Sequence, residues 1–144
     1  VLTYVLVEIV RSAGPEFDRV VVVNGHGGNA YALRAASRVC EAEGRRLEVW
    51  SIRLPGADAH AGRTETSLML AVAPETVRLD RAEAGATEPL GELLPKMMEV
   101  GVKEVSANGV LGDPAGADEV EGRRLLSALI DDAVAQVTGR SATP

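Results

Sequence analysis

The chain has 144 residues, of which 46% are hydrophobic and 25% are charged, as is typical of a soluble globular protein. Its net charge of −6 argues against nucleic acid or an anionic membrane surface as a partner, and no apolar stretch reaches the ~20 residues of a membrane span. The single cysteine, Cys40, excludes an internal disulfide and fits a reducing, cytoplasmic location, so we expect a cytoplasmic protein with residues 1–144 in a single domain.

Helical and extended patterns alternate in the first part of the chain. Apolar residues at helical spacing predict a helix that ends at GPEFD (14–18). The β-branched run 19–24 predicts a strand buried on both faces. Asn29 is expected to cap a helix that ends near Gly44, and a second strand is predicted over 45–52. These elements predict an α/β fold with parallel strands and right-handed crossovers.

The rest of the chain is predicted to be mainly loops and helices. The expected elements are a loop over 53–63, a helix over 64–73, irregular chain over 81–114 with a helix broken around Pro95, a turn over 109–114, a helix over 118–137 and a frayed tail over 138–144. Loops 24–29 and 53–63 each follow a strand, so they should open on the same edge of the sheet. They contain the two histidines of the chain, His26 and His60.

The first of these loops, NGHGGN (24–29), allows several interpretations. Its glycines could bring backbone N–H groups close to a phosphate, although the motif matches neither GxGxxG nor GxxxxGK[ST]. It could be a structural turn in which His26 has no chemical role. It could also bring His26 to a metal ion, but one histidine is not a complete site.

The second loop places His60 five residues before Glu65, which falls in the first turn of the predicted helix. There the helix dipole favours the ionised carboxylate, and Glu65 could simply cap the helix. An imidazole and a carboxylate at one strand edge are also the groups that metal-assisted hydrolysis needs, one to hold an ion and one to move protons.

Three motifs, VVVNGHGGNA, DAHAGRTETSLML and GVLGDPAGADEVEG, closely resemble the creatininase family of metal-dependent amidohydrolases in their order and spacing. The resemblance runs from about Val5 to Val137 and implies a three-layer α/β/α fold with a mainly parallel sheet. Within the family, the chain is most similar to peptidases that release a C-terminal Val-Tyr dipeptide from a modified precursor peptide. Creatininase itself has a glutamate where this chain has Gly28, which disfavours hydrolysis of creatinine.

The resemblance also implies roles for individual residues. His26 matches a metal ligand and Glu65 is expected to add a second one, while His60 matches the histidine that transfers a proton to the leaving nitrogen. Backbone N–H groups of Gly27 and Gly28 are expected to hold the developing oxyanion. The implied metals are iron(II), zinc or manganese, one or two per site.

The implied substrate is a small peptide or a cyclic amide, and the implied assembly is a homo-oligomer, a hexamer in the family. Family members carry further metal ligands on an N-terminal strand and loop that are not found in this sequence. We therefore expect the chain to correspond to the C-terminal part of the domain, with the N-terminal strands missing, and to bind metal weakly by itself. A nucleotide-binding α/β module and a noncatalytic assembly fragment are the alternative functions.

Overall fold

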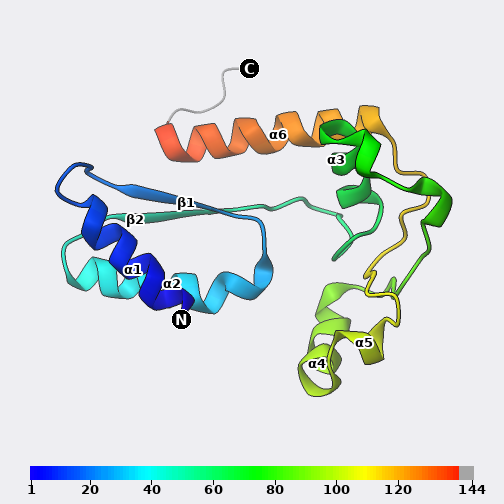
Figure 1. Ribbon diagram of the computed structural model, residues 1–144, viewed down its shortest axis with the longest axis horizontal. Helices are drawn as coiled ribbons and strands as arrows, with labels where there is room; N and C mark the ends of the chain where they lie inside the picture. The colour runs from blue at the N-terminus through cyan, green and yellow to red at the C-terminus, as the bar shows by residue number, and fades with distance from the viewer. Residues whose placement is uncertain (140–144) are drawn as a thin grey trace. The chain divides into compact units, whose positions relative to one another are not determined.

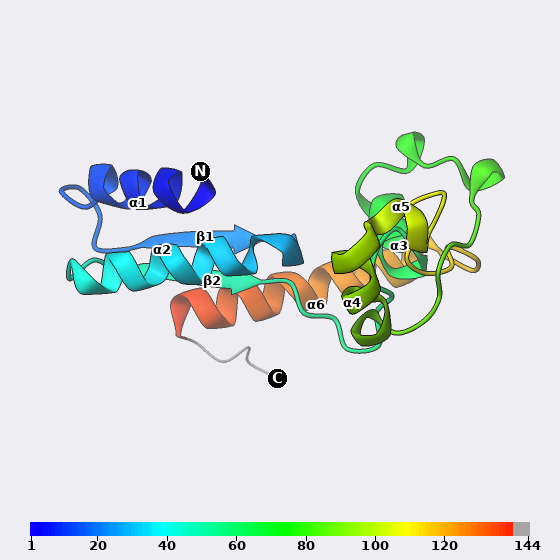
Figure 2. The same ribbon diagram turned by 90° about the horizontal axis from the view of Figure 1, so that it is seen from below.

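The computed structural model describes residues 1–139, in which helices and strands alternate at first and helices follow (Figures 1 and 2). Residues 140–144 of the expected tail lie outside the described part. The main elements are α1 (Leu2–Ala13), β1 (Val20–Asn24), α2 (Ala30–Ala42), β2 (Leu47–Ser51), α3 (Arg63–Val72), α4 (Leu90–Val100), α5 (Val102–Val105) and α6 (Glu119–Thr138), with short 3-10 turns at Gly27–Asn29, Pro74–Thr76 and Leu79–Arg81. The chain divides into two compact units: the first comprises Val1–Arg53 and the chain from Asp131 onward, and the second Leu54–Ile130.

The first unit is built on two parallel strands, as the sequence predicts. β1 pairs with β2 from Val20 opposite Leu47 to Asn24 opposite Ser51. Both strands therefore end at the same edge of the sheet. The expectation that β1 is buried on both faces is wrong, because Val23 is 68% exposed on the face opposite Val20 and Val22.

Helices α1 and α2 lie on one side of the strands (Figure 1). Their contact is a small apolar core that Val20 and Leu47 extend towards the sheet; its buried members are Val7, Val10, Ala36 and Cys40. Cys40 is fully buried in this core, and its burial raises the pKa of the thiol. On the other face of β2, the buried Trp50 donates its Nε1–H to Asp132 Oδ2 of α6 at 2.7 Å.

The second unit consists of helices and ordered loops. Helix α4 continues through Pro95, so the predicted break around this residue is wrong. Because proline has no N–H, the helix lacks only the hydrogen bond that residue 95 would donate to the carbonyl oxygen of Gly91. The helix packs against the rest of the unit through Leu93, which is buried. Gly101, with a φ of +87°, ends the helix and α5 follows directly.

No helix among residues 1–139 combines the length and apolar character that a membrane span requires.

Candidate active site

The second unit brings two of the predicted site residues into direct contact. His60 Nδ1 lies 2.9 Å from Glu65 Oε2, a distance at which an Nδ1–H donates to a carboxylate. Both side chains are accessible, with 61% of the His60 side chain and 48% of the Glu65 side chain exposed. Because Nδ1 faces the carboxylate, Nε2 is the ring nitrogen that remains to exchange a proton with a substrate.

The backbone around His60 is fixed by the segment 109–114. Leu111 pairs with His60 as an antiparallel bridge, in which Leu111 N donates to His60 O at 2.8 Å and His60 N donates to Leu111 O at 3.0 Å. Ala59 N donates to the same Leu111 oxygen. The sequence predicted only a turn here, because pairing between residues 51 positions apart leaves no local pattern.

Glu65 is the third helical residue of α3, the position of the glutamate in a capping box. Its Oε2 accepts the backbone N–H of Ala61 at 2.7 Å as well as facing His60. Ala61 has a φ of +54°, a left-handed conformation that costs a residue with a Cβ about 1–2 kcal/mol. The turn between His60 and the helix is therefore held in a strained conformation by the carboxylate that also contacts the imidazole.

A second carboxylate, Asp58, supports the same turn. Its Oδ1 accepts the backbone N–H of Thr64 at 3.1 Å, which satisfies one of the free donors at the start of α3. Its side chain lies against Gly62 and Gly112: a Cβ on Gly62 would be 1.7 Å from Asp58 Oδ2, and a Cβ on Gly112 would be 2.7 Å from Asp58 Cβ. The sequence does not reveal this role of Asp58, because the six-residue spacing to Thr64 is not a standard capping pattern.

Helix α3 is tied to α6 behind this turn. Arg63 Nε donates to Glu121 Oε2 at 2.7 Å, and this hydrogen bond raises the pKa of the Arg63 guanidinium. The buried Ser67 donates to the same carboxylate oxygen at 3.3 Å and accepts the backbone N–H of Asp118 at 3.1 Å. Asp58 on one side and Glu121 of α6 on the other therefore fix the start of α3, which carries Glu65.

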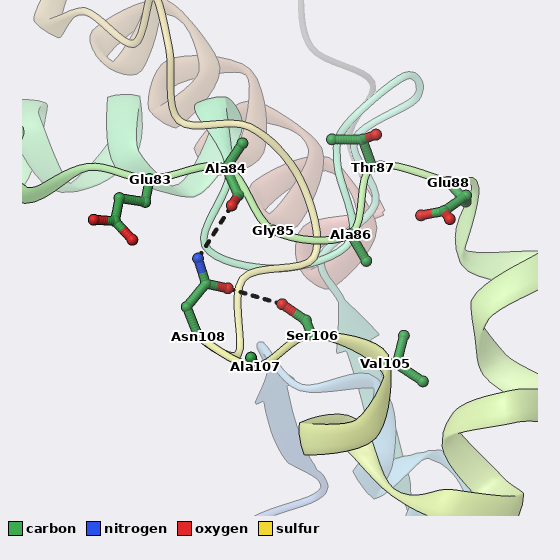
Figure 3. A pocket seen from close by; sticks show the side chains of 10 residues that line it. All are labelled: Glu83, Ala84, Gly85, Ala86, Thr87, Glu88, Val105, Ser106, Ala107 and Asn108. Atoms are coloured by element: carbon green, nitrogen blue, oxygen red, sulfur yellow. Dashed lines mark hydrogen bonds between the residues drawn. The ribbon is translucent and has the colours of Figure 1, made fainter.

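A hollow of about 530 Å³ lies between the segments 83–88 and 105–108 (Figure 3). Figure 3 shows Asn108 between Ala84 and Ser106: its Nδ2 donates to Ala84 O at 3.1 Å, and its Oδ1 accepts the Ser106 hydroxyl at 2.8 Å. The lining is mostly backbone and small side chains, and its titratable groups are Glu83 and Glu88. The hollow lacks an imidazole, so the chemistry is better placed at His60.

The other predicted site residues lie in the first unit, on the loop after β1. The buried Asn24 organises this loop, because its Oδ1 accepts the backbone N–H of His26 at 3.3 Å and its Nδ2 donates to Ser51 Oγ at 3.3 Å. Asn29 Nδ2 also donates to Asn24 Oδ1, at 3.1 Å. Asn29 therefore occupies the N-cap position of α2, as expected, but its side chain binds the strand end and makes no capping hydrogen bond.

His26 is exposed on this loop, and its imidazole lies over Gly28. A Cβ on Gly28 would be 2.5 Å from His26 Nε2, so the missing side chain leaves room for the ring. Gly27 and Gly28 begin the 3-10 turn Gly27–Asn29, where the first N–H groups have no partner within the turn. His26, Gly27 and Gly28 thus belong to the first unit, and His60 and Glu65 to the second.

A catalytic divalent metal site commonly has three protein ligands. Among residues 1–139, no three His, Cys, Asp or Glu side chains are grouped so that they could hold a metal ion. The described residues therefore do not fit a complete metal centre, and His26 is a single exposed imidazole.

Comparison with known proteins gives consistent results. Residues 1–137 match the protein family described as creatinine amidohydrolase, or creatininase. The chain is 50% identical over 136 residues to the mycofactocin precursor peptide peptidase of Mycobacterium ulcerans and 45% identical over 130 residues to that of Mycolicibacterium smegmatis. These alignments cover 94% and 90% of this chain but 54% and 53% of those proteins. The chain spans about half the length of the curated relatives it matches.

The fold is similar to two solved structures. A putative creatinine amidohydrolase from Bacteroides fragilis matches with a TM-score of 0.73 at 19% identity, over 99% of this chain and 62% of that one. A creatinine amidohydrolase (creatininase) matches with a TM-score of 0.69 at 26% identity, over 94% of this chain and 62% of that one. The first of these likenesses shows the fold alone.

Proposed function

This chain belongs to the creatininase family, and on that basis we propose that it carries the proton-transfer residues of an amide or peptide hydrolase. Its relatives are named mycofactocin precursor peptide peptidase, so the substrate we propose is a modified precursor peptide that loses a C-terminal Val-Tyr dipeptide. The observation that carries the proposal is the 2.9 Å contact between His60 Nδ1 and Glu65 Oε2.

The contact supports a specific role for each residue. Hydrolysis of an amide adds water to the carbonyl carbon and breaks the C–N bond, and the leaving nitrogen must gain a proton as it departs. With Nδ1–H held by Glu65, His60 Nε2 is available to take a proton from the attacking water and to deliver it to that nitrogen. Backbone N–H groups of Gly27 and Gly28 are proposed to stabilise the oxyanion.

The creatininase family is metal-dependent, and iron(II), zinc or manganese would suit imidazole and carboxylate ligands. We propose His26 as a ligand that this chain contributes to such a centre. For Glu65 we propose an orienting role, because Oε2 faces His60 and accepts the N–H of Ala61, and the role of a metal ligand is the alternative.

We also propose the larger setting in which these residues act. The two parallel strands would belong to the wider, mainly parallel sheet of a three-layer α/β/α domain, and the match over residues 1–137 supports a single domain that includes both units. A cytoplasmic homo-oligomer, hexameric as in the family, is the proposed assembly.

The test uses the chain joined behind the N-terminal portion of the Mycobacterium ulcerans relative, here called the joined enzyme. The substrate is a peptide that ends in Val-Tyr, and mass spectrometry measures release of the dipeptide. His60→Ala should lower kcat by about 10²–10⁴-fold and leave metal content unchanged. The matched control, His26→Ala, should instead lower metal content. Unchanged turnover in His60→Ala would exclude the proposed role, and absence of turnover in the unsubstituted joined enzyme would favour the noncatalytic alternative.

A further inference from the structure

Asp58 closes the turn that carries His60, and we infer that it is a positioning residue that keeps Glu65 on the imidazole. This inference rests on the proposed function of His60. Asp58 lies two residues before His60 in the chain, and its carboxylate binds the N–H of Thr64, the residue before Glu65. It therefore links the two ends of the turn that holds the pair.

The two carboxylates at the start of α3 divide the backbone donors between them. Asp58 Oδ1 accepts the N–H of Thr64 inside the helix, and Glu65 Oε2 accepts the N–H of Ala61 outside it. The first N–H groups of a helix have no partner in the helix itself, and a glutamate at the third position commonly turns back to bind one of them. Without Asp58, the carboxylate of Glu65 would be drawn towards these free donors and away from His60.

The surrounding backbone accommodates the Asp58 side chain in one place. A Cβ on Gly62 would overlap the carboxylate of Asp58, and a Cβ on Gly112 would come too close to the Cβ of Asp58. The absence of side chains at both glycines therefore leaves the space that the Asp58 side chain fills. Gly112 belongs to the segment whose residue Leu111 pairs with the backbone of His60. Asp58 thus contacts both the helix that carries Glu65 and the segment that holds His60.

The inference predicts a spectroscopic signature in the 144-residue chain. A neutral imidazole in water prefers the proton on Nε2, whereas a carboxylate at Nδ1 favours the Nδ1–H form. Nitrogen-15 NMR at a pH where the rings are neutral reports the tautomer of each histidine. Because the chain has two histidines, His26→Ala assigns the signals, and His26 serves as the internal reference.

We expect Nδ1–H to be the major form of His60 in the unsubstituted chain and the minor form in Asp58→Ala. Asp58→Asn should retain the Nδ1–H form, because its side-chain oxygen still accepts the N–H of Thr64. The matched control is Asp118→Ala, which removes a carboxylate that accepts the N–H of Glu121 at the start of α6 and should leave the tautomer unchanged. If Asp58→Ala does not fold, Gly62→Ala displaces the carboxylate without removing it and should give the same change of tautomer.

Activity of the joined enzyme provides the second measurement. Asp58→Ala should lower kcat by about 10–100-fold with little change in KM, since it misplaces the imidazole and leaves the substrate contacts in place, and Asp58→Asn should restore most of the rate. A folded Asp58→Ala or Gly62→Ala that keeps the Nδ1–H form would overturn the inference. The tautomer needs neither metal nor substrate, so it tests Asp58 even if His60→Ala shows that the proposed function is wrong.

Discussion

Gly122 of α6 lies directly on Ser67 of α3, and a Cβ at residue 122 would be 1.8 Å from the carbonyl oxygen of Ser67. Ser67 is fully buried, and its hydroxyl binds both Glu121 and the backbone of Asp118. The two helices can approach this closely only because residue 122 has no side chain. This contact fixes the helix that presents Glu65 to His60.

Gly122→Ala should therefore lower the free energy of unfolding by about 1–3 kcal/mol, as overpacking of a tight contact does. Chemical denaturation followed by circular dichroism measures the change. Gly91→Ala is the matched control, because Gly91 is also helical and a Cβ there meets nothing within 4 Å. The control should be neutral or stabilising by up to about 1 kcal/mol. Equal stability changes in the two variants would contradict the close approach of α3 and α6.

Ala61 occupies a conformation that glycine adopts more readily. Ala61→Gly should remove about 1–2 kcal/mol of backbone strain and cost about 0.5–1 kcal/mol through the greater freedom of the unfolded chain. The expected net effect is a stabilisation of up to about 1.5 kcal/mol, measured by denaturation. The same substitution at Ala128, an exposed residue inside α6, should destabilise by about 1 kcal/mol. A comparable loss of stability at both positions would show that the turn at Ala61 is not strained.

Glu65→Gln in the joined enzyme separates the two roles considered for Glu65. If Glu65 orients His60, the variant should keep its metal and lose about 10–100-fold in kcat, as is usual when the partner of a functional histidine is changed. Elemental analysis and peptide hydrolysis on the same samples measure both quantities. Loss of metal, with activity partly restored by excess metal, would instead establish the ligand role that the sequence suggested.

Stability of the first unit should depend on pH through Glu43 at the end of α2. Arg11 of α1 donates its Nε–H to Glu43 Oε2 at 3.0 Å, and this hydrogen bond lowers the pKa of Glu43 below its ordinary value of 4.5. A carboxyl with a lowered pKa in the folded state stabilises the protein above the pKa of the unfolded state, and the stabilisation is lost as the pH falls through the folded value.

Glu43→Gln should therefore lower the unfolding temperature at pH 7, and its difference from the unsubstituted chain should shrink below pH 4.5. The difference should also shrink at high salt, since both side chains are partly exposed. Glu41→Gln, at an exposed position two residues earlier on α2, is the control for loss of one negative charge. A difference that stays constant from pH 7 to below 4.5 would show that the pair does not stabilise the fold.

Local patterns in the sequence predicted much of this structure. The β-branched run before NGHGGN and the next extended run are the two parallel strands, and the His60–Glu65 spacing placed a carboxylate near the imidazole. The errors came from contacts that local patterns do not contain. The side chain of Asn29 binds the end of β1 and makes no capping bond to α2, and α4, with Leu93 buried, continues through Pro95.

The support of His60 by Leu111 and the cap from Asp58 were also not predicted. Each depends on residues that only the folded chain brings together. Sequence patterns therefore pointed to His60 and Glu65 as a pair, and the structure was needed to show the contacts that hold their turn.

The segment around Leu111 is shared between two neighbours on opposite sides. Leu111 bonds to His60, while the carbonyl oxygens of Val110 and Gly112 accept N–H groups from Ala86 and Gly85. Because neighbouring backbone groups in an extended chain point to opposite sides, removing or adding one residue would exchange the two sets of partners. The number of residues in the segment around Leu111 is therefore constrained by its backbone hydrogen bonds. Exchange of one apolar side chain for another at Val110 would leave the bonds to His60 unchanged.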